Sequence, residues 1–298
     1  MISRDAVDWS ADRAAIDRAL ADLCDRFAPR LAEPIASAVR YALLGSGKRL
    51  RGLLVVAAYR AASGDGDATG LAAAVEVVHS YSLVHDDLPC MDDDDVRRGR
   101  PTTHRAVGVR AATVAGVSMV PLAAAAALDA CGKLGLSPEE GGRVVGELMR
   151  ASGAGGMVGG QLLDLEGEGR PLGIAELEHI HRGKTGALIR AAAVVGGIAA
   201  RASASRVAAL ATFGATIGLA FQIADDVLDV TATTDRLGKT AGRDRDLRKS
   251  TYPVLLGVEG AAERARSLVA EGRCALESAG LLSRELEALA NFAVEREW

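Results

Sequence analysis

Apolar residues recur every three or four positions along most of this chain, and that spacing places them on one face of an α-helix. Ser137-Pro138-Glu139-Glu140 is a typical helix start, with serine as the N-cap and proline at the first helical position. We predict loops over Ser63 to Gly70, Arg97 to His104, Glu166 to Gly173 and Thr231 to Thr251. We predict helices over Ala11 to Leu44, Arg51 to Ala62, Leu71 to Asp87, Ala111 to Leu134, Ser137 to Leu165, Ile174 to Ala202, Ser205 to Val230, Tyr252 to Ala279 and Ser283 to Glu297.

The composition favours an all-α protein. Of the 298 residues, 49% are apolar and only 3% are aromatic, and the abundant Ala and Leu favour helix. Short β-branched runs bounded by glycine, which a parallel α/β protein would need, are few. No Pro/Ser-rich linker or low-complexity tail divides the chain. We therefore expect residues 1–298 to form one all-α domain, an antiparallel assembly of helices.

Charge and cysteine content limit the possible partners and location. The formal net charge is -4, so no general basic field would attract nucleic acid or an anionic membrane. The four cysteines show no paired spacing, and the N-terminal segment lacks the apolar core of a signal peptide. These features indicate a cytoplasmic protein with reduced thiols. Ala111 to Leu128 carries no charge, but its many alanines favour a buried core helix over a transmembrane segment.

Two clusters of aspartates each follow an apolar stretch. The first is Asp86-Asp87, a Leu-Pro-Cys-Met turn that can bring Asp92 back beside Asp86, and then Asp92 to Asp95. The second is Asp225-Asp226-Val-Leu-Asp229. Carboxylates beside apolar helix faces are unfavourable unless a cation pairs with them. We interpret the clusters as two walls of one metal site, and their oxygen ligands suit Mg2+ rather than zinc or copper.

Gln222, Asp225, Asp226 and Asp229 are spaced i, i+3, i+4 and i+7, so they share one helical face. A solvated acidic stripe is the alternative, but the preceding residues 207–224 carry no charge, which is unusual for a surface helix. For Asp93 to Asp95, a hydrated acidic loop is an equally good explanation. The first cluster is not an EF-hand, because no glycine stands at the sixth loop position.

A glycine-rich turn precedes a pair of basic residues. Gly45-Ser-Gly-Lys-Arg49 is not a phosphate-binding P-loop, because residue 42 is alanine and Arg49 stands where Ser or Thr is needed. We expect instead a turn that presents Lys48 and Arg51 to an anion.

Six motifs occur in a set order: Gly47-Lys-Arg-Leu-Arg51, the segment from His79 to His104, Gly160-Gln-Leu-Leu-Asp164, Gly183-Lys-Thr-Gly186, Phe221-Gln-Ile-Ala-Asp-Asp-Val-Leu-Asp229 and Lys249-Ser-Thr-Tyr-Pro253. Together they resemble the short-chain trans-isoprenyl diphosphate synthases. The matches run from about residue 45 to residue 253. The resemblance implies the isoprenoid synthase fold, in which antiparallel helices surround a deep central pocket, and it implies a homodimer.

The resemblance also implies a reaction. An allylic diphosphate ionises, the alkene of isopentenyl diphosphate attacks the cation head to tail, and a proton is lost. By similarity, Mg2+ is the cofactor, with three ions when the allylic diphosphate is bound. Its ligands would be Asp86, Asp87, Asp92, Asp225 and Asp229. Arg97, Lys184 and Lys239 would complete the anion site, Lys48, Arg51, His79 and Arg98 would bind isopentenyl diphosphate, and Lys249 would also contact substrate. Thr185 and Gln222 would turn oxygen dipoles toward the carbocation.

Tyr81 lies five residues before the first aspartate, where the family places the floor of the pocket for the prenyl tail. An aromatic residue there, with two extra residues inside the first aspartate motif, resembles a farnesyl (C15) rather than a geranylgeranyl (C20) enzyme. The geranylgeranyl synthase is therefore the main alternative. A terpene cyclase and a non-catalytic partner subunit are weaker ones, because both aspartate motifs are whole.

Some positions depart from the family's pattern. Gly52 stands where proline is common, and Arg248 stands where glycine often precedes the last motif. Val107-Gly108-Val109 and Gly116-Val117-Ser118-Met119 replace the usual residues of two further segments. The last two segments touch the tail pocket in the family, so product length and the preferred allylic substrate stay open.

Overall fold

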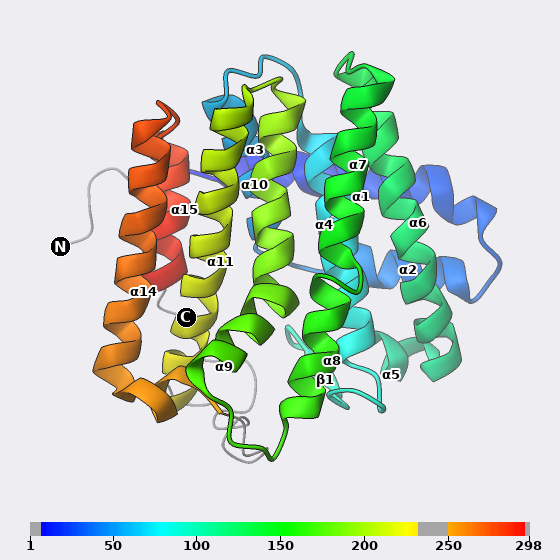
Figure 1. The fold of residues 1–298 in the computed structure, drawn as a ribbon. Helices are drawn as coiled ribbons and strands as arrows, with labels where there is room; N and C mark the ends of the chain where they lie inside the picture. Colours follow the sequence, from blue (N-terminus) through cyan, green and yellow to red (C-terminus); the bar gives the residue numbers. More distant parts are fainter. Residues whose placement is uncertain (1–6, 232–249, 296–298) are drawn as a thin grey trace.

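The computed structural model describes residues 7–231 and 250–295, and most of these are helical (Figure 1). The prediction of an all-α fold is confirmed. In chain order the elements are α1 (Ser10–Phe27), η1 (Ala28–Arg30), α2 (Ile35–Leu43), α3 (Leu50–Ala61), α4 (Thr69–Asp86), β1 (Val96–Arg97), β2 (Arg100–Pro101), α5 (Thr103–Val107), α6 (Val109–Lys133), α7 (Pro138–Ser152), α8 (Met157–Gly167), α9 (Ile174–His181), η2 (Arg182–Gly186), α10 (Ala187–Ala199), α11 (Ala204–Thr231), α14 (Tyr252–Ser278) and α15 (Arg284–Glu295).

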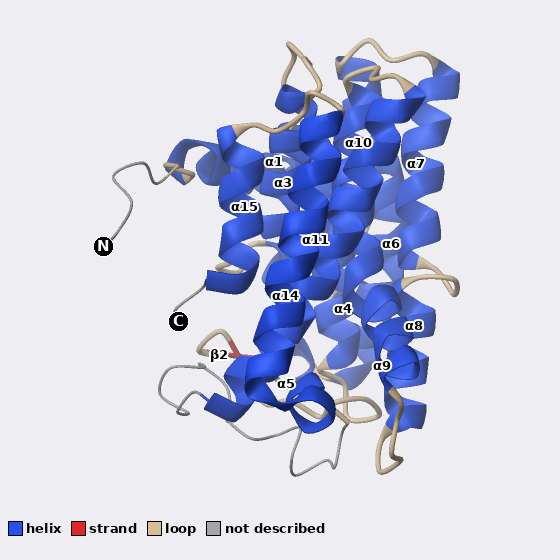
Figure 2. Cartoon of the chain, turned by 60° about the vertical axis from the view of Figure 1, so that its left-hand side comes forward, coloured by secondary structure: helices blue, strands red, loops and turns tan. Residues whose placement is uncertain are grey.

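The long helices lie side by side around α10 and α11 (Figures 1 and 2). α10 packs on α3, α7 and α11, and nearly all of its residues are buried, as expected for a helix that is apolar on every side. α11 packs on α14 and α15 as well, and contributes Phe213, Leu219 and Ile223 to the core. α4 packs on α1, α3 and α6. The hydrophobic core therefore lies where each of these helices packs against several neighbours.

Several predicted helices are interrupted. The stretch predicted from Ala11 to Leu44 is broken between α1 and α2, where Pro29 and Pro34 lack the N–H that a continuous helix needs. The stretch predicted from Ser137 to Leu165 breaks over residues 153–156, three of which are glycines. The predicted start of α7 is confirmed, because Ser137 Oγ accepts from the Glu140 backbone while Glu140 caps Ser137 in return.

Two further differences lie near the aspartate clusters. A five-residue π-helix, η2, separates α9 from α10 inside the stretch predicted as one helix from Ile174 to Ala202. The loop predicted from Arg97 to His104 contains most of a two-stranded hairpin, with Val96 opposite Pro101, and the start of α5. Single-turn π-helices often occur at functional sites.

The aspartate-bearing ends of α4 and α11 lie at the same end of the molecule. In Figure 1 both helices run down to the lower end, where α5, the hairpin and the kinked chain around α9 also lie. The two aspartate clusters, which are far apart in the sequence, are thus brought to one end of the helix assembly.

In the part of the chain that the structure describes, two helices, α6 and α11, are long and apolar enough to cross a membrane by length and composition alone. In their most apolar windows 50% and 56% of residues are buried inside the protein. α11 is enclosed by α10, α14 and α15. For α6 the prediction of a core helix holds on one side only, since Val114, Val117 and Leu128 are exposed on the other.

Candidate active site

The first aspartate cluster is folded back on the end of α4. After Asp86 the chain turns through Leu88 to Met91, and the backbone N–H of Asp92 donates to the backbone oxygen of Asp86 at 2.8 Å. Asp93 donates in the same way to Leu88 at 3.1 Å. The predicted return of Asp92 to Asp86 is confirmed, and two carboxylates therefore lie at the C-terminal end of a helix, where the helix dipole favours bound cations.

Asp86 lies where a negative charge is unfavourable without a cation. Burial raises the pKa of Asp86 to about 6, Asp92 adds to the shift, and the charges of Lys184 and Arg97 oppose it. Asp87 is buried and accepts from Arg97 Nε at 2.7 Å, yet burial still raises the pKa of this carboxyl. In both cases the nearby positive charges do not fully offset the cost of burying the carboxylate.

The hairpin places the two arginines of the first motif. Arg98 and Gly99 form its two-residue turn with φ of 54° and 73°, as type I′ turns require. Arg97 turns toward Asp87 and also contacts Asp94 at 3.3 Å. Arg98 donates from Nη1 to the backbone oxygen of Ser46 at 2.7 Å. The hairpin therefore joins the first aspartate cluster to the loop before α3.

The second aspartate cluster lies on the last turns of α11, and its members have different partners. Gln222 Oε1 accepts from Thr185 Oγ1 at 2.9 Å, so these two predicted residues are neighbours. Asp226 is buried and accepts from the backbone N–H of Tyr252 at 3.0 Å, which fixes the start of α14. Asp225 is half-buried and Asp229 is buried. Asp226 thus has a structural task, while Asp225 and Asp229 remain the candidate metal ligands.

The π-helix η2 sets the positions of Lys184 and Thr185. Lys184 Nζ contacts Asp164 Oδ2 of α8 at 2.6 Å, and its charge also reaches Asp86. α8 and η2 approach so closely that a Cβ on Gly160 would lie 2.0 Å from the Lys184 nitrogen, so only glycine fits there. The glycines of both motifs therefore bring Lys184 from η2 up to the first aspartate cluster.

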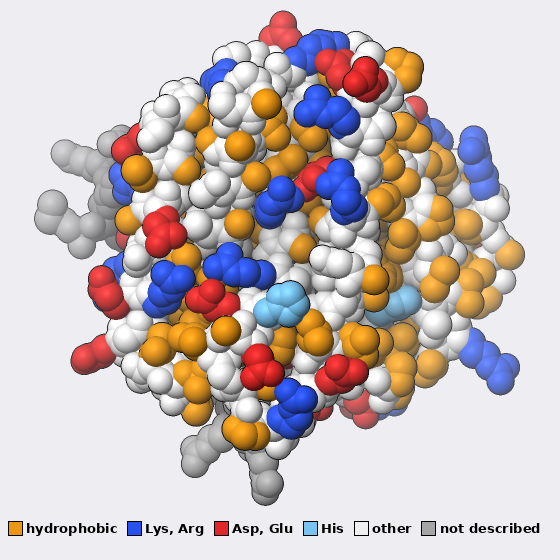
Figure 3. Space-filling model, viewed as in Figure 1, with side chains coloured by type: hydrophobic (Ala, Val, Ile, Leu, Met, Phe, Trp, Pro, Cys, Tyr) orange, Lys and Arg blue, Asp and Glu red, His pale blue; other side chains and the backbone are white. Residues whose placement is uncertain are grey.

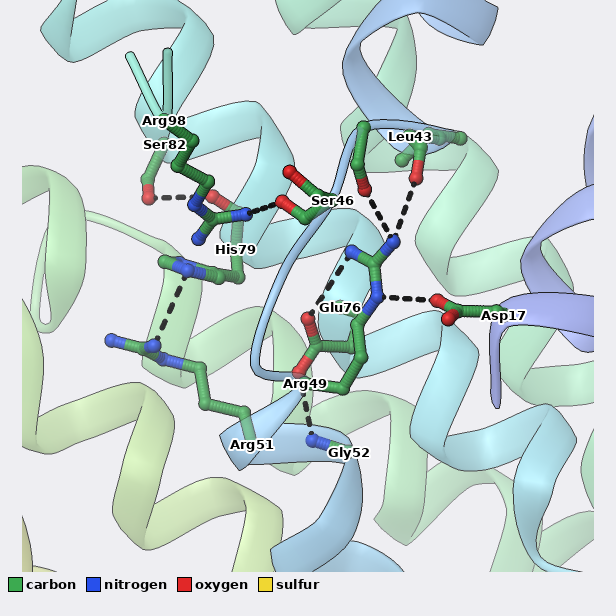
Figure 4. Close-up of polar contacts among 11 residues, drawn as sticks. Asp17, Leu43, Ser46, Arg49, Arg51, Gly52, Glu76, His79, Ser82 and Arg98 are labelled. Atoms are coloured by element: carbon green, nitrogen blue, oxygen red, sulfur yellow. Dashed lines mark hydrogen bonds and ion pairs between the residues drawn. The ribbon is translucent and has the colours of Figure 1, made fainter. Parts of the chain in front are cut away.

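Arg51 and His79 lie side by side near the start of α3, and Lys48 lies just before that helix. Arg51 Nη1 lies 3.4 Å from His79 Nε2 of α4 (Figure 4). Lys48 Nζ lies 5.4 Å from the centre of the Phe292 ring, a cation–π contact with α15. Burial lowers the pKa of Arg51, whereas Glu76 and Asp225 oppose that shift. Arg51 is therefore within electrostatic reach of the second aspartate cluster.

His79 is neutral in this setting. Burial lowers its pKa well below the ordinary value of 6.5, and the positive charges of Arg51, Arg98, Arg97 and Arg49 add to the effect. A neutral imidazole can accept from or donate to a ligand without repelling these guanidinium groups.

This shift predicts a pH dependence of stability. Below pH 6.5 the unfolded chain gains a proton on His79 that the folded protein does not bind, so acid favours unfolding. Between about pH 7.5 and about pH 5.5, wild type should lose more unfolding free energy than His79→Gln, by up to about 1.4 kcal/mol. Urea denaturation at both pH values measures this difference. An equal loss in the two proteins would contradict the assignment.

Three predicted residues remain: Tyr81, Lys239 and Lys249. Tyr81 is half-buried on α4, and its ring meets the His85 ring edge-on with centroids 4.9 Å apart. Lys239 and Lys249 lie outside the described residues. A small open cleft adjoins the first cluster, between α2, α4 and the hairpin. Its lining includes Ser46, Ser80, Asp87, Arg97 and Arg98.

Residues 32–276 match the family described as polyprenyl synthetase. The chain belongs to the polyprenyl synthetase family. The match covers most of the chain and includes both aspartate clusters, so the resemblance seen in the motifs is confirmed.

Curated relatives in this family include enzymes of two product lengths. The chain is 43% identical to the farnesyl diphosphate synthase of Escherichia coli over 274 residues, or 88% of this chain and 89% of that enzyme. It is 46% identical to chloroplastic geranylgeranyl pyrophosphate synthase 12 of Arabidopsis thaliana over 239 residues. That match covers 78% of this chain and 66% of the plant enzyme. Prenyl-chain elongation is thereby supported, and product length is left open.

Solved structures of prenyl synthases share the fold. The geranylgeranyl pyrophosphate synthetase of Pyrococcus horikoshii aligns with a TM-score of 0.83 and 33% identity, over 96% of this chain and 97% of that one. A Helicobacter pylori geranyltransferase, solved with magnesium and isoprenyl diphosphate, aligns with a TM-score of 0.75 and 28% identity. That alignment covers 94% of this chain and 96% of the other.

The donor set fits the magnesium of that neighbour. The candidate ligands are carboxylate oxygens, which Mg2+ prefers, and the raised pKa of Asp86 marks a position where a cation would relieve unfavourable charge. Within residues 7–231 and 250–295, no three acidic, histidine or cysteine side chains converge on one metal position. Mg2+ commonly takes one or two carboxylates plus substrate phosphates, so two separate aspartate walls suit a metal that also binds a diphosphate.

Several residues that shape this polyprenyl synthetase site were not predicted. Asp164 ends the motif that begins at Gly160, but its pairing with Lys184 depends on how α8 packs against η2. The bond from Tyr252 to Asp226 and the contacts of Arg49 and Glu76 also join distant segments. One signal was available: a glutamate three residues before His79 on an otherwise apolar helix needs a buried partner.

Proposed function

We propose that this protein is a Mg2+-dependent trans-prenyltransferase of one domain that makes farnesyl diphosphate. It would condense dimethylallyl or geranyl diphosphate head to tail with isopentenyl diphosphate. The observation that carries the proposal is the meeting of two sets of side chains at one end of the molecule. The aspartate-bearing ends of α4 and α11 lie there with the hairpin. The charges of Arg97 and Lys184 act on Asp86, and Asp225 acts on Arg51 of α3.

The allylic diphosphate would lie between the two aspartate clusters. Asp86, Asp87 and Asp92 on one side, and Asp225 and Asp229 on the other, would hold Mg2+. When bound, the metal supplies the positive charge that stabilises the pyrophosphate leaving group. Arg97 and Lys184 would add to this charge, and their present partners Asp87 and Asp164 keep both side chains oriented toward the site.

Isopentenyl diphosphate would lie beside the start of α3. Lys48, Arg51 and Arg98 supply positive charge for its diphosphate, and neutral His79 supplies a hydrogen-bonding ring next to Arg51. The hydroxyl of Thr185 and the amide of Gln222, held together by their mutual bond, would direct oxygen dipoles toward the allylic cation. The departing pyrophosphate can accept the proton that is lost in the last step, so no side-chain base is required.

A farnesyl product is favoured by Tyr81. Its ring is half-buried on α4 and braced edge-on by His85, on the same helix that ends at Asp86. The alternative is a geranylgeranyl product, which the Arabidopsis and Pyrococcus relatives make according to their names. A cyclase or a non-catalytic subunit would not need the Lys48, Arg51 and Arg98 group.

A homodimer in the cytoplasm is part of the proposal. Hydrophobic side chains gather over α6 (Figure 3), where Val114, Val117 and Leu128 are exposed. An uncharged helix face of this kind is typical of a subunit interface. The chain is also 43% identical to an Arabidopsis protein named as the large subunit of a heterodimeric geranylgeranyl pyrophosphate synthase. We therefore propose that a second copy of this chain packs against α6. A different protein as the partner is the alternative.

Removing the metal tests the chemistry. Excess EDTA should reduce incorporation of labelled isopentenyl diphosphate to background, because the carboxylate walls then repel the diphosphate instead of binding it through a cation. Adding Mg2+ beyond the EDTA should restore the rate. Unchanged turnover in EDTA would contradict the metal assignment, and circular dichroism checks that the protein stays folded.

A further inference from the structure

The start of α3 lacks the cap that a helix normally provides for itself. Arg49 is the residue before the helix, its φ is 54°, and its side chain makes no capping bond. Glu76 of α4 takes that task instead, because its Oε1 accepts from the backbone N–H of Gly52 at 2.9 Å (Figure 4). Gly52 is the third residue of α3, the position whose N–H a capping side chain usually satisfies.

Arg49 ties the same point to three other segments. Arg49 is only 6% exposed, and its side chain donates from Nε to Asp17 of α1 at 2.7 Å. It also donates to the backbone oxygens of Gly45 and Leu43, at 2.7 and 3.4 Å. Its Nη1 lies 3.9 Å from Glu76, which is 2% exposed. The guanidinium thus locks α1, the end of α2, the start of α3 and α4 together.

These contacts surround the residues assigned to isopentenyl diphosphate. Lys48 and Arg51 flank Arg49 in the chain, and His79 lies one helical turn after Glu76 on α4. Glu76 and His79 therefore hold the first turn of α3 at two successive points, Gly52 and Arg51. A shift at either point would move Lys48 and Arg51 relative to His79.

Gly52 stands at a position where proline is common in the family. Proline has no N–H, so it could not donate to Glu76. A Cβ at this position would also lie 3.2 Å from Glu76 Cγ and 3.1 Å from Ile16 Cδ1, which is tight. The glycine therefore gives this chain a buried hydrogen bond that a proline would remove.

We propose that Arg49 and Glu76 are positioning residues for isopentenyl diphosphate, which hold Lys48 and Arg51 in place by fixing the start of α3. This inference rests on the proposed function. Neither residue is expected to touch the substrate: Glu76 is negative and buried, and Arg49 is already engaged by Asp17 and backbone oxygens.

The experiment compares Glu76→Met, Glu76→Gln and Arg49→Met/Glu76→Met with wild type. The matched control is Glu147→Met, because Glu147 is likewise 6% exposed and pairs with Arg150 and Arg190 between α7 and α10. Three quantities are measured: the Kd for isopentenyl diphosphate by calorimetry, the KM for each substrate, and Tm. These separate binding of the two substrates from stability.

Glu76→Met should raise both Kd and KM for isopentenyl diphosphate about tenfold or more, since small displacements of anchoring groups have large effects. The KM for geranyl diphosphate should change less than about twofold, because its proposed ligands lie on other elements. Glu76→Gln keeps an acceptor for Gly52, so its rise should be smaller. In the double variant Tm should recover, because no buried charge is left unpaired and Asp17, which loses its arginine, is exposed. The KM for isopentenyl diphosphate should stay raised.

The control should lose Tm without changing either KM. The proposal is overturned if isopentenyl diphosphate binding is unchanged in Glu76→Met, or if both KM values rise together. It is also overturned if the KM recovers along with Tm in the double variant. A wild-type protein that neither binds nor consumes isopentenyl diphosphate would overturn the proposed function as well, which distinguishes the two failures.

Discussion

Replacing Asp86 or Asp225 by asparagine should lower prenyl transfer by about a thousandfold or more in a protein that stays folded. Each change removes one negative charge from one wall of the proposed metal site and leaves the side chain's shape unaltered. The fold should tolerate Asp86→Asn well. Because burial raises the pKa of Asp86 to about 6, its charge opposes folding at neutral pH in the metal-free protein.

The measurement is the initial rate with saturating geranyl and isopentenyl diphosphates over a range of Mg2+ concentrations. Asp93→Asn is the matched control, because Asp93 lies exposed in the same loop and asparagine also accepts its φ of 49°. The control should keep its rate within about twofold, as exposed substitutions usually do. Near-normal turnover in either Asp86→Asn or Asp225→Asn would refute the two-walled metal site.

Tyr81→Ala should change the main product from C15 to C20. The substitution removes the aromatic ring that is half-buried on α4 and packed edge-on against His85, so the growing chain could extend past this point. Five residues along a helix correspond to about 7.5 Å, which places residue 81 well below the diphosphate end at Asp86. Product length is read by chromatography of the dephosphorylated prenyl alcohols.

Tyr81→Phe is the control for this change, because it keeps the ring and removes only the hydroxyl. It should still give C15. If Tyr81→Ala also stops at C15, the floor of the pocket lies elsewhere. The departures at Val107 to Val109 and Val117 to Met119, at α5 and in α6, would then be the next places to examine.

The helical fold and the local geometry of the two aspartate clusters could be predicted because they depend on local pattern. The spacing of Gln222, Asp225 and Asp229 is fixed by the helix that carries them, and the turn after Asp86 is short enough to return Asp92 to it. Helix interruptions at Pro34 could have been predicted as well, because proline lacks a backbone donor. The apolar pattern on both sides concealed that break.

The rest of the site depends on contacts between segments far apart in the chain. The π-helix at Arg182–Gly186 is held where Gly160 lets α8 approach Lys184, and nothing within that motif reveals its neighbour. Glu76 caps α3 by accepting from Gly52, which lies twenty-four residues earlier in the chain, and Asp226 holds the start of α14 at Tyr252. Such partners follow from the packing of helices, which periodicity alone does not determine.

The most direct test of the central claim is a product assay with the purified protein and Mg2+. Labelled isopentenyl diphosphate would be supplied separately with dimethylallyl, geranyl and farnesyl diphosphates. We predict a C15 product from the first two and no extension of farnesyl diphosphate. A C20 product, above all from farnesyl diphosphate, would contradict the farnesyl assignment while keeping the chemistry, and no product from any of the three would contradict prenyl transfer itself.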